Sequence, residues 1–256
     1  MSRLELNERD MDEVQRSASQ ASKVALLPFD PTQIDRYMDP PASTVYPLEY
    51  AFHLLGDVRS KVVLDLGCGS GESIVPLVKR GARVIGIDIS PDLIELARKR
   101  VQIAGVEAAL SVRSAYETEL QDQSVDVIFC MSLIHHLDIP RVRDEMRRIL
   151  AGDGYIILKE PVRFSSGYAA LRGLLPSHED VSEAEHPLTR EELSTLLEGF
   201  TAEGLRYFRL PIVPVALRTR LPAASSMAWQ FSDWLLRKGG KLAERYATSV
   251  AVKMKK

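Results

Sequence analysis

The chain has 256 residues and a mass of 28.6 kDa, which is enough for one sizeable hydrophobic core or a core with a small cap. Its 33 basic and 35 acidic residues give a formal net charge of -2 at pH 7, so charge offers no basis for binding nucleic acid. The two cysteines exclude a disulfide framework, and the sequence has neither an apolar leader nor an apolar run of about 18 residues. We therefore expect a cytoplasmic protein without a nucleic-acid partner and without stable membrane insertion.

Residues 1–57 are predicted to form an N-terminal arm and a lid segment. The residues up to Lys23 are polar and weakly patterned, and Leu26–Pro47 is rich in proline, aspartate and aromatic residues. Such a composition is typical of an irregular loop, and a short helix is expected after it at Leu48–Leu55. The hydrophobic period then changes abruptly, so we place the main domain at residues 58–256.

Between Lys61 and Glu160, short apolar and β-branched runs alternate with amphipathic stretches, which predicts a parallel sheet with crossover helices. The predicted strands are Val62–Leu66, Arg83–Ile87, Ala109–Val112, Val125–Cys130 and Tyr155–Lys159. The predicted helices are Glu72–Lys79, Pro91–Ala104 and Pro140–Leu150. Ser90 is a good N-cap for the second of these helices, and Gly105 stands where that helix should end.

The last third of the chain predicts one helix, two strands and an insertion between the strands. Thr189 and Glu192 have the spacing of a capping box, which begins a predicted helix at Arg190–Leu197. The two strands are expected near Leu205–Leu210 and at Thr248–Met254. Residues 211–246 between them are predicted to form a small helical cap together with the N-terminal segment.

The insertion carries apolar side chains at helical spacing, namely Met227, Phe231, Trp234 and Leu235. Such a stripe packs on its own domain and lines part of a pocket, or else it makes transient contact with lipid. We favour packing.

The first predicted strand runs into a glycine-rich loop, Asp65-Leu66-Gly67-Cys68-Gly69-Ser70-Gly71. Glycines between a strand and a helix start allow a sharp turn and let a ligand approach the backbone. A dinucleotide-binding loop has the spacing G-x-G-x-x-G, whereas these glycines follow G-x-G-x-G, with Asp65 two residues before the first. The loop therefore favours a ligand with a cationic group, such as an amino-acid ammonium, over a pyrophosphate. A turn-stabilising role is the alternative for Asp65.

The second predicted strand ends in Gly86-Ile87-Asp88-Ile89-Ser90, which puts Asp88 at the carboxyl edge of the sheet beside the glycine loop. A carboxylate there can accept hydrogen bonds from both hydroxyls of a ribose. Capping of the next helix is the alternative, but Ser90 is better placed for it.

From about Val58 to Phe200 the sequence resembles the class I S-adenosylmethionine-dependent methyltransferases, in particular the branch with the ubiquinone-biosynthesis methylases and small-molecule methyltransferases. The resemblance rests on the two segments just quoted, on Val125–Cys130, and on Arg147–Leu150 with the glycines that follow it. It implies a Rossmann-like α/β fold with a seven-stranded, mostly parallel sheet, helices on both faces and an antiparallel last strand. It also implies S-adenosyl-L-methionine as cofactor. The residues that we expect to bind this cofactor are Asp65, Gly67, Cys68, Gly69, Gly71, Asp88, Ile89, Ser114, Ala115, Tyr116 and Met131.

The chain departs from the family pattern after the third strand. The family commonly has an acidic residue there, which accepts from the adenine amino group, followed by a small residue, whereas this chain has Ser114-Ala115-Tyr116-Glu117. Ser114 can still form a hydrogen bond and the Ala115 amide can still face the ring, and Tyr116 or Glu117 could share these contacts.

Methyl transfer from a sulfonium needs chiefly an acceptor held in line, and positioning alone can supply roughly 7–11 kcal/mol. A hydroxyl acceptor also benefits from a base, and the candidates are His135, His136 and Glu160, which follow the fourth and fifth strands. Packing or loop-fixing roles are the alternatives. The stretch from His178 to His186 lacks compact metal-ligand spacing, so no metal site is expected.

The sequence therefore predicts an S-adenosylmethionine-dependent methyltransferase acting on a small, partly apolar molecule, with oxygen as the favoured acceptor atom. The alternatives are a carbon or nitrogen methyltransferase acting on a quinone-like or lipid substrate, and a cofactor-binding protein without catalytic activity. A monomer or a homodimer is expected.

Overall fold

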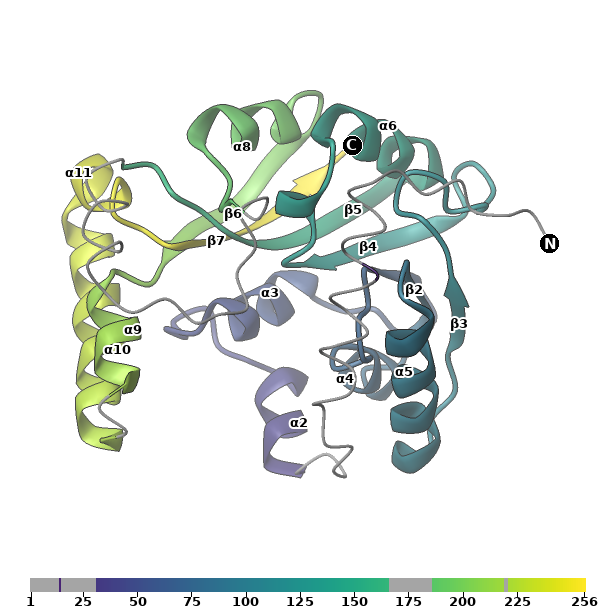
Figure 1. The fold of residues 1–256 in the computed structure, drawn as a ribbon, viewed down its shortest axis with the longest axis horizontal. Coiled ribbons are helices and arrows are strands. Elements are labelled where there is room, and N and C mark those ends of the chain that lie inside the picture. The colour runs from purple at the N-terminus through teal and green to yellow at the C-terminus, as the bar shows by residue number, and fades with distance from the viewer. Residues whose placement is uncertain (1–13, 15–30, 166–185, 219–220) are drawn as a thin grey trace.

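The computed structural model describes residue 14 and residues 31–165, 186–218 and 221–256. Its centre is a seven-stranded sheet with the order β3-β2-β1-β4-β5-β7-β6 (Figure 1). The strands are β1 (Val62–Leu66), β2 (Arg83–Asp88), β3 (Ala109–Val112), β4 (Val125–Met131), β5 (Leu150–Pro161), β6 (Thr201–Phe208) and β7 (Ser249–Lys255). β7 pairs antiparallel with both β5 and β6, and the pairs among β1 to β5 are parallel. The predicted fold class is confirmed.

Helices cover both faces of the sheet, and each face has its own hydrophobic core (Figure 1). One core lies under α6 and α8 and the other under α3, α4 and α5. The helices of the described residues are α2 (Pro31–Met38), α3 (Pro47–Leu55), α4 (Ile74–Lys79), α5 (Pro91–Ala104), η1 (Ile134–His136), α6 (Ile139–Ile149), α8 (Arg190–Leu197), α9 (Ile212–Arg218), α10 (Pro222–Lys238) and α11 (Gly240–Glu244). None of these helices is long and apolar enough to cross a membrane.

Local capping signals give the observed helix ends. The Ser90 side chain accepts a hydrogen bond from the backbone of Leu93 at the start of α5, and Gly105 ends that helix in the left-handed conformation. Thr189 and Glu192 form both hydrogen bonds of the predicted capping box at α8.

The prediction of an irregular loop at Leu26–Pro47 is wrong for part of that range, because α2 occupies Pro31–Met38. Pro31 provides a favourable first turn, and Tyr37 packs on Phe52 of α3 with ring centroids 4.7 Å apart. The helix is therefore favoured by a tertiary contact that composition does not reveal.

Two strands begin earlier than predicted. β5 starts at Leu150, directly after α6, and β6 starts at Thr201. The pairing of β6 with β7 is irregular between Glu203 and Arg206, and Gly204 has a φ of +60°. This irregularity and the exposed edge position remove the alternating pattern by which the strand would be recognised.

The insertion at residues 211–246 is helical where it is described, and it contacts the N-terminal segment. Tyr46 packs edge-on against Trp229 of α10 with ring centroids 5.0 Å apart. Arg206 of β6 donates to the carbonyl of Ala42 and forms an ion pair with Asp233 of α10. The two segments that we predict to form a cap therefore lie against each other.

Candidate active site

The glycine-rich loop between β1 and α4 is fixed by its backbone. The amides of Gly67 and Cys68 both donate to the carbonyl of Ile87, each over 2.9 Å. Arg100 of α5 donates to the carbonyl and the hydroxyl of Ser70 over 2.7 and 2.8 Å. The sequence does not predict this contact between Arg100 and Ser70. The helix Pro91–Ala104 contains several basic residues, and no local pattern shows which of them points toward the glycine loop.

The three glycines of the loop all have positive φ, but their surroundings differ. A Cβ at Gly67 would lie 2.8 Å from Leu133, and a Cβ at Gly71 would lie 3.0 Å from Ala97. A Cβ at Gly69 would meet nothing within 4 Å. Gly67 and Gly71 therefore allow close packing, whereas the space beside Gly69 can take a ligand.

Asp65 lies under this loop with only 2% of its surface exposed. Among the residues that the structure describes, no donor reaches its Oδ2 atom. Burial and the neighbouring charge of Asp88 raise the pKa of Asp65 to about 8. A buried carboxylate oxygen without a donor is costly, and a cationic ligand group would satisfy it. The residue therefore fits an ammonium group better than a turn-stabilising role.

Asp88 orders the same loop from the end of β2. Its Oδ2 accepts from the Gly69 amide and its Oδ1 from the Ser90 amide, each over 2.9 Å. The side chain that caps α5 is that of Ser90, as the sequence predicts. The neighbouring Ile89 is half-buried, and burial raises the pKa of the Cys68 thiol, which keeps it neutral.

The predicted adenine side follows β3. The Ser114 hydroxyl accepts from the Tyr116 amide over 3.2 Å, and the Tyr116 hydroxyl accepts from the Asp138 amide over 2.7 Å. The guanidinium of Arg141 lies 4.4 Å from the centre of the Tyr116 ring. Tyr116 is therefore held against the start of α6, and Ala115 beside it is half-buried.

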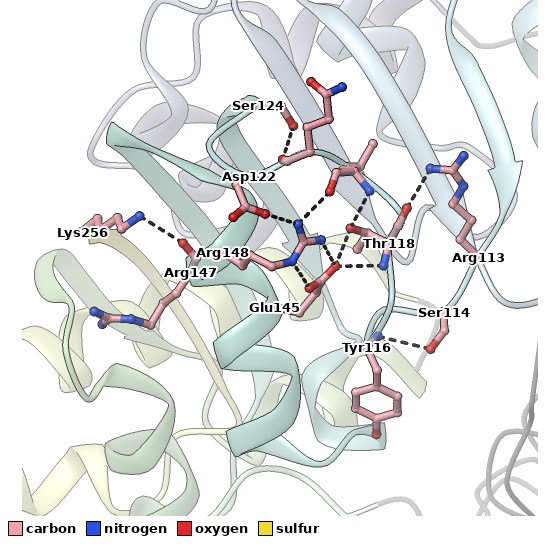
Figure 2. A network of polar contacts seen from close by, with 12 residues as sticks. Arg113, Ser114, Tyr116, Thr118, Asp122, Ser124, Glu145, Arg147, Arg148 and Lys256 are labelled. Carbon is pink, nitrogen blue, oxygen red and sulfur yellow. Dashed lines mark hydrogen bonds and ion pairs between the residues drawn. The ribbon is translucent and has the colours of Figure 1, made fainter.

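A polar network fixes the rest of this loop to α6 (Figure 2). Both the amide and the hydroxyl of Thr118 donate to Oε1 of Glu145, over 2.9 and 2.6 Å. Arg148 donates to both oxygens of Glu145 over 2.8 Å and to Asp122 over 2.6 Å. Burial alone would raise the pKa of Glu145, but the hydrogen bonds from Arg148 and Thr118 outweigh it and lower the pKa below its usual value.

We expect Glu145→Gln to lower the free energy of unfolding by about 1–3 kcal/mol at pH 7, because it leaves Arg148 and Thr118 with a weaker acceptor. A carboxyl with a lowered folded pKa stabilises the protein above its unfolded pKa, and this contribution is lost as pH falls through the folded pKa. The difference between wild type and variant, measured by urea unfolding, should therefore shrink in acid. Glu198→Gln is the matched control, because its ion pair with Arg143 is exposed and should contribute less than about 1 kcal/mol. Equal losses in both variants would contradict the role assigned to this network.

The three candidate bases lie together at the ends of β4 and β5. Glu160 is fully buried, and its Oε1 accepts from the amides of Leu133 and Ile134 over 2.8 and 2.9 Å. Its Oε2 lies 2.7 Å from Nδ1 of His135, whose ring centroid is 4.0 Å from that of His136. A carboxylate bound to Nδ1 favours the tautomer in which Nε2 is the ring's acceptor nitrogen. Glu160 therefore fixes the loop and orients a histidine at the same time.

Sequence reasoning missed Ser132 and Lys159 in the same place. Lys159 pairs with Met131 across the sheet, and its ammonium donates to the Ser132 hydroxyl. Ser132 has a φ of +58°, a strained conformation for a residue other than glycine. Burial lowers the pKa of Lys159. The sequence does place Lys159 in a predicted buried strand next to Glu160, and a lysine at such a position could have indicated a functional residue.

The stretch from His178 to His186, where no metal site is expected, is only partly covered by the structure. His178, Glu179, Asp180, Glu183 and Glu185 lie outside the described residues. Nε2 of His186 lies 3.7 Å from Oε1 of Glu192. Within the described ranges, no group of three histidine, cysteine or acidic side chains could hold a metal ion.

Comparisons with known proteins identify a methyltransferase domain within the chain. Residues 64–158 match a family model described as a methyltransferase domain. The ubiquinone biosynthesis O-methyltransferase of Serratia proteamaculans (strain 568) is 32% identical over 95 residues, which cover 36% of this chain and 39% of that protein. The chain thus matches well under two thirds of that relative's length.

Solved structures share the fold across most of the chain. A geranyl diphosphate C-methyltransferase from Streptomyces coelicolor A3(2) has a TM-score of 0.64 at 15% identity, and the match covers 97% of this chain and 98% of that enzyme's chain. A SAM dependent methyltransferase from Archaeoglobus fulgidus has a TM-score of 0.55 at 20% identity and covers 82% of this chain and 92% of its own. At these identities the likeness shows the fold alone. The match to a methyltransferase domain at residues 64–158, together with the fold and the glycine loop, supports a class I S-adenosylmethionine-dependent methyltransferase.

Proposed function

We propose that this protein transfers the methyl group of S-adenosyl-L-methionine to an oxygen atom of a small, partly apolar acceptor. The observation that carries the choice of oxygen is the buried Glu160–His135 pair at the carboxyl ends of β4 and β5. The glycine loop and Asp88 lie at the same edge of the sheet, where ligands of open α/β folds bind.

The cofactor fits the residues at the ends of β1 and β2. When bound, it supplies a methyl group on a positively charged sulfur, which is reactive without further activation. Asp65 would hold its ammonium, because a cation satisfies the unpartnered oxygen and lowers the cost of ionising this carboxyl. Asp88 would accept from the ribose hydroxyls, and the space beside Gly69 allows the ligand to approach the backbone.

His135 is the residue that we assign to the acceptor's proton. Glu160 accepts a hydrogen bond from Nδ1–H, which leaves Nε2 as the basic nitrogen and stabilises the ring when it becomes positively charged. Glu160 itself is fully buried and has three donors, so it acts as a positioning residue. The ring of His136 packs against that of His135, with centroids 4.0 Å apart and planes tilted by 40°.

Two kinds of relative bear on the acceptor atom. Relatives named ubiquinone biosynthesis O-methyltransferase support oxygen, although the match covers only part of them. The structural similarity to a geranyl diphosphate C-methyltransferase keeps carbon as the second candidate. Nitrogen and a cofactor-binding protein without activity are the remaining alternatives.

A pair of glycine variants tests the cofactor site. Gly69 and Gly105 both have positive φ, and a Cβ would meet nothing within 4 Å at either position. Alanine should therefore cost a similar amount of stability in both, about 1 kcal/mol. We expect Gly69→Ala to weaken the binding of S-adenosylhomocysteine at least roughly tenfold, because its methyl group occupies the ligand's space. Gly105→Ala, at the far end of α5, should leave the affinity unchanged. If calorimetric titration gave the same affinity for Gly69→Ala and Gly105→Ala, Gly69 would not belong to the cofactor site.

The experiment that tests the proposed function is a calorimetric titration with S-adenosylmethionine and S-adenosylhomocysteine on the wild type and on Asp88→Ala. Saturable binding that the variant loses supports the cofactor site. It then justifies an acceptor screen with phenolic and quinol compounds, analysed for methylation on oxygen and on carbon. A wild type that binds neither nucleoside would refute the enzyme function. Binding with methylation on carbon alone would refute the choice of oxygen.

A further inference from the structure

The outer face of α10 exposes three large apolar side chains in one stripe. Met227, Phe231 and Trp234 are 71%, 49% and 56% exposed, and they follow one another at helical spacing. The rings of Phe231 and Trp234 stack with their centroids 6.0 Å apart. We call these three residues the α10 stripe.

The stripe is not the face by which α10 packs on the protein. That face consists of Ala228, Ser232 and Leu236, which are buried. The Leu210 amide donates to the Ser232 hydroxyl over 2.8 Å. A surface helix normally has one apolar face, and a second one indicates a further apolar contact.

Exposed apolar side chains are concentrated in this part of the molecule. Eight of the eleven large apolar side chains that are exposed among the described residues lie between Ile212 and Tyr246. This range contains α9, α10 and α11, which lie together at one end of the molecule (Figure 1). Such a concentration is larger than the scattered exposed side chains of an ordinary surface.

The segment that contains α10 and α11 has a net charge opposite in sign to that of the whole chain. Residues 221–247 contain four basic and two acidic residues, whereas the whole chain has a formal net charge of -2. The basic residues are Arg237, Lys238, Lys241 and Arg245, and all four are exposed. Asp233 is neutralised by ion pairs with Arg206 and Arg237. Lys238 lies one helical turn beyond Trp234, so cations directly continue the stripe.

We propose that the α10 stripe and the basic residues after it dock this protein on an anionic phospholipid surface. Aromatic and long apolar side chains insert at the level of the headgroups, and lysine and arginine contact the lipid phosphates. The helix lies on the surface, because it is too short and too polar to span the bilayer. The charges disfavour a second copy, since a symmetric interface through this face would bring the same cations of both chains together. The proposal does not depend on the proposed enzymatic function.

The test uses the full chain with vesicles of phosphatidylcholine and phosphatidylglycerol in equal parts, and with pure phosphatidylcholine. Co-sedimentation measures binding, and the tryptophan emission of the protein should shift to shorter wavelength in the bound state. We expect Phe231→Ser combined with Trp234→Ser to weaken binding at least roughly tenfold. Lys238→Glu combined with Lys241→Glu should do the same. The matched control combines Ile103→Ser with Lys99→Glu on α5, which also removes an exposed apolar side chain and a cation, and should bind as the wild type does.

Each other outcome would overturn the proposal. These outcomes are no binding to anionic vesicles, equal binding to pure phosphatidylcholine, and equal losses in the control. Sedimentation equilibrium without vesicles tests the alternative occupant. A dimer that the Phe231→Ser and Trp234→Ser changes dissociate would assign the stripe to a second copy of the chain. Circular dichroism and thermal melting verify that all variants fold.

Discussion

Asp65→Asn is expected to make the protein more stable and less able to bind its cofactor. The folded protein holds the pKa of Asp65 at about 8, far above the ordinary value of 3.8, so it favours the neutral carboxyl. Stability from this residue is therefore greatest below the unfolded pKa and falls as pH rises from about 4 to 8. Asparagine imitates the neutral form at every pH. We expect a gain of about 2–5 kcal/mol in the free energy of unfolding at pH 8 and almost none at pH 4.

The affinity for the cofactor should decrease in the same variant, although its stability increases. An amide cannot neutralise an ammonium, so Asp65→Asn should weaken S-adenosylhomocysteine binding roughly 30-fold or more. Unfolding in guanidinium at both pH values and calorimetric titration measure the two effects. Asp126→Asn is the control, because Asp126 accepts from the Val62 amide at the opposite end of β1. It should leave the affinity for S-adenosylhomocysteine unchanged. A destabilised Asp65→Asn variant at pH 8 would show that this carboxyl has a structural partner.

His135→Ala is expected to lower kcat for an oxygen acceptor by about 10²–10⁴, because the variant lacks the base that takes the hydroxyl proton. Glu160→Gln should also lower kcat substantially. Its amide can still accept from Leu133 and Ile134, but its NH₂ group would face Nδ1 of His135 and favour the wrong tautomer. Both variants should keep the wild-type affinity for S-adenosylhomocysteine, which separates catalysis from folding and cofactor binding.

His136→Ala is the matched control for this prediction, since His136 packs against His135 with ring centroids 4.0 Å apart, whereas the buried Glu160 bonds to His135 itself. We expect a loss of less than about tenfold in kcat for His136→Ala. Steady-state kinetics with an oxygen acceptor measure kcat and KM for both variants. A kcat for His135→Ala close to that of the wild type would indicate that no base is needed and would favour carbon as the acceptor atom.

Local patterns in the sequence determine the central sheet and the cofactor loop. The strand at Val62–Leu66 has the predicted bounds, because its apolar, β-branched run can be buried only in a sheet covered on both faces. The strand at Ala109–Val112 also has the predicted bounds, although it lies at the edge of the sheet and is only partly buried. The helix Pro91–Ala104 also has the predicted bounds, since Ser90, Pro91 and Gly105 each favour one backbone conformation. Asp65, Gly69 and Asp88 meet at one edge because the carboxyl ends of parallel strands do.

Only the tertiary structure decided which partners these residues have. His135 and Glu160 are 25 positions apart, and their hydrogen bond exists because β4 and β5 are neighbours in the sheet. The raised pKa of Asp65 comes from burial beside Asp88, which no local pattern encodes. The apolar side chains of α10 have helical spacing in the sequence, but packing alone decides that Leu236 is buried while Phe231 faces outward. Backbone conformation depends on neighbours along the chain, whereas burial, charge and contact depend on residues that are distant in sequence.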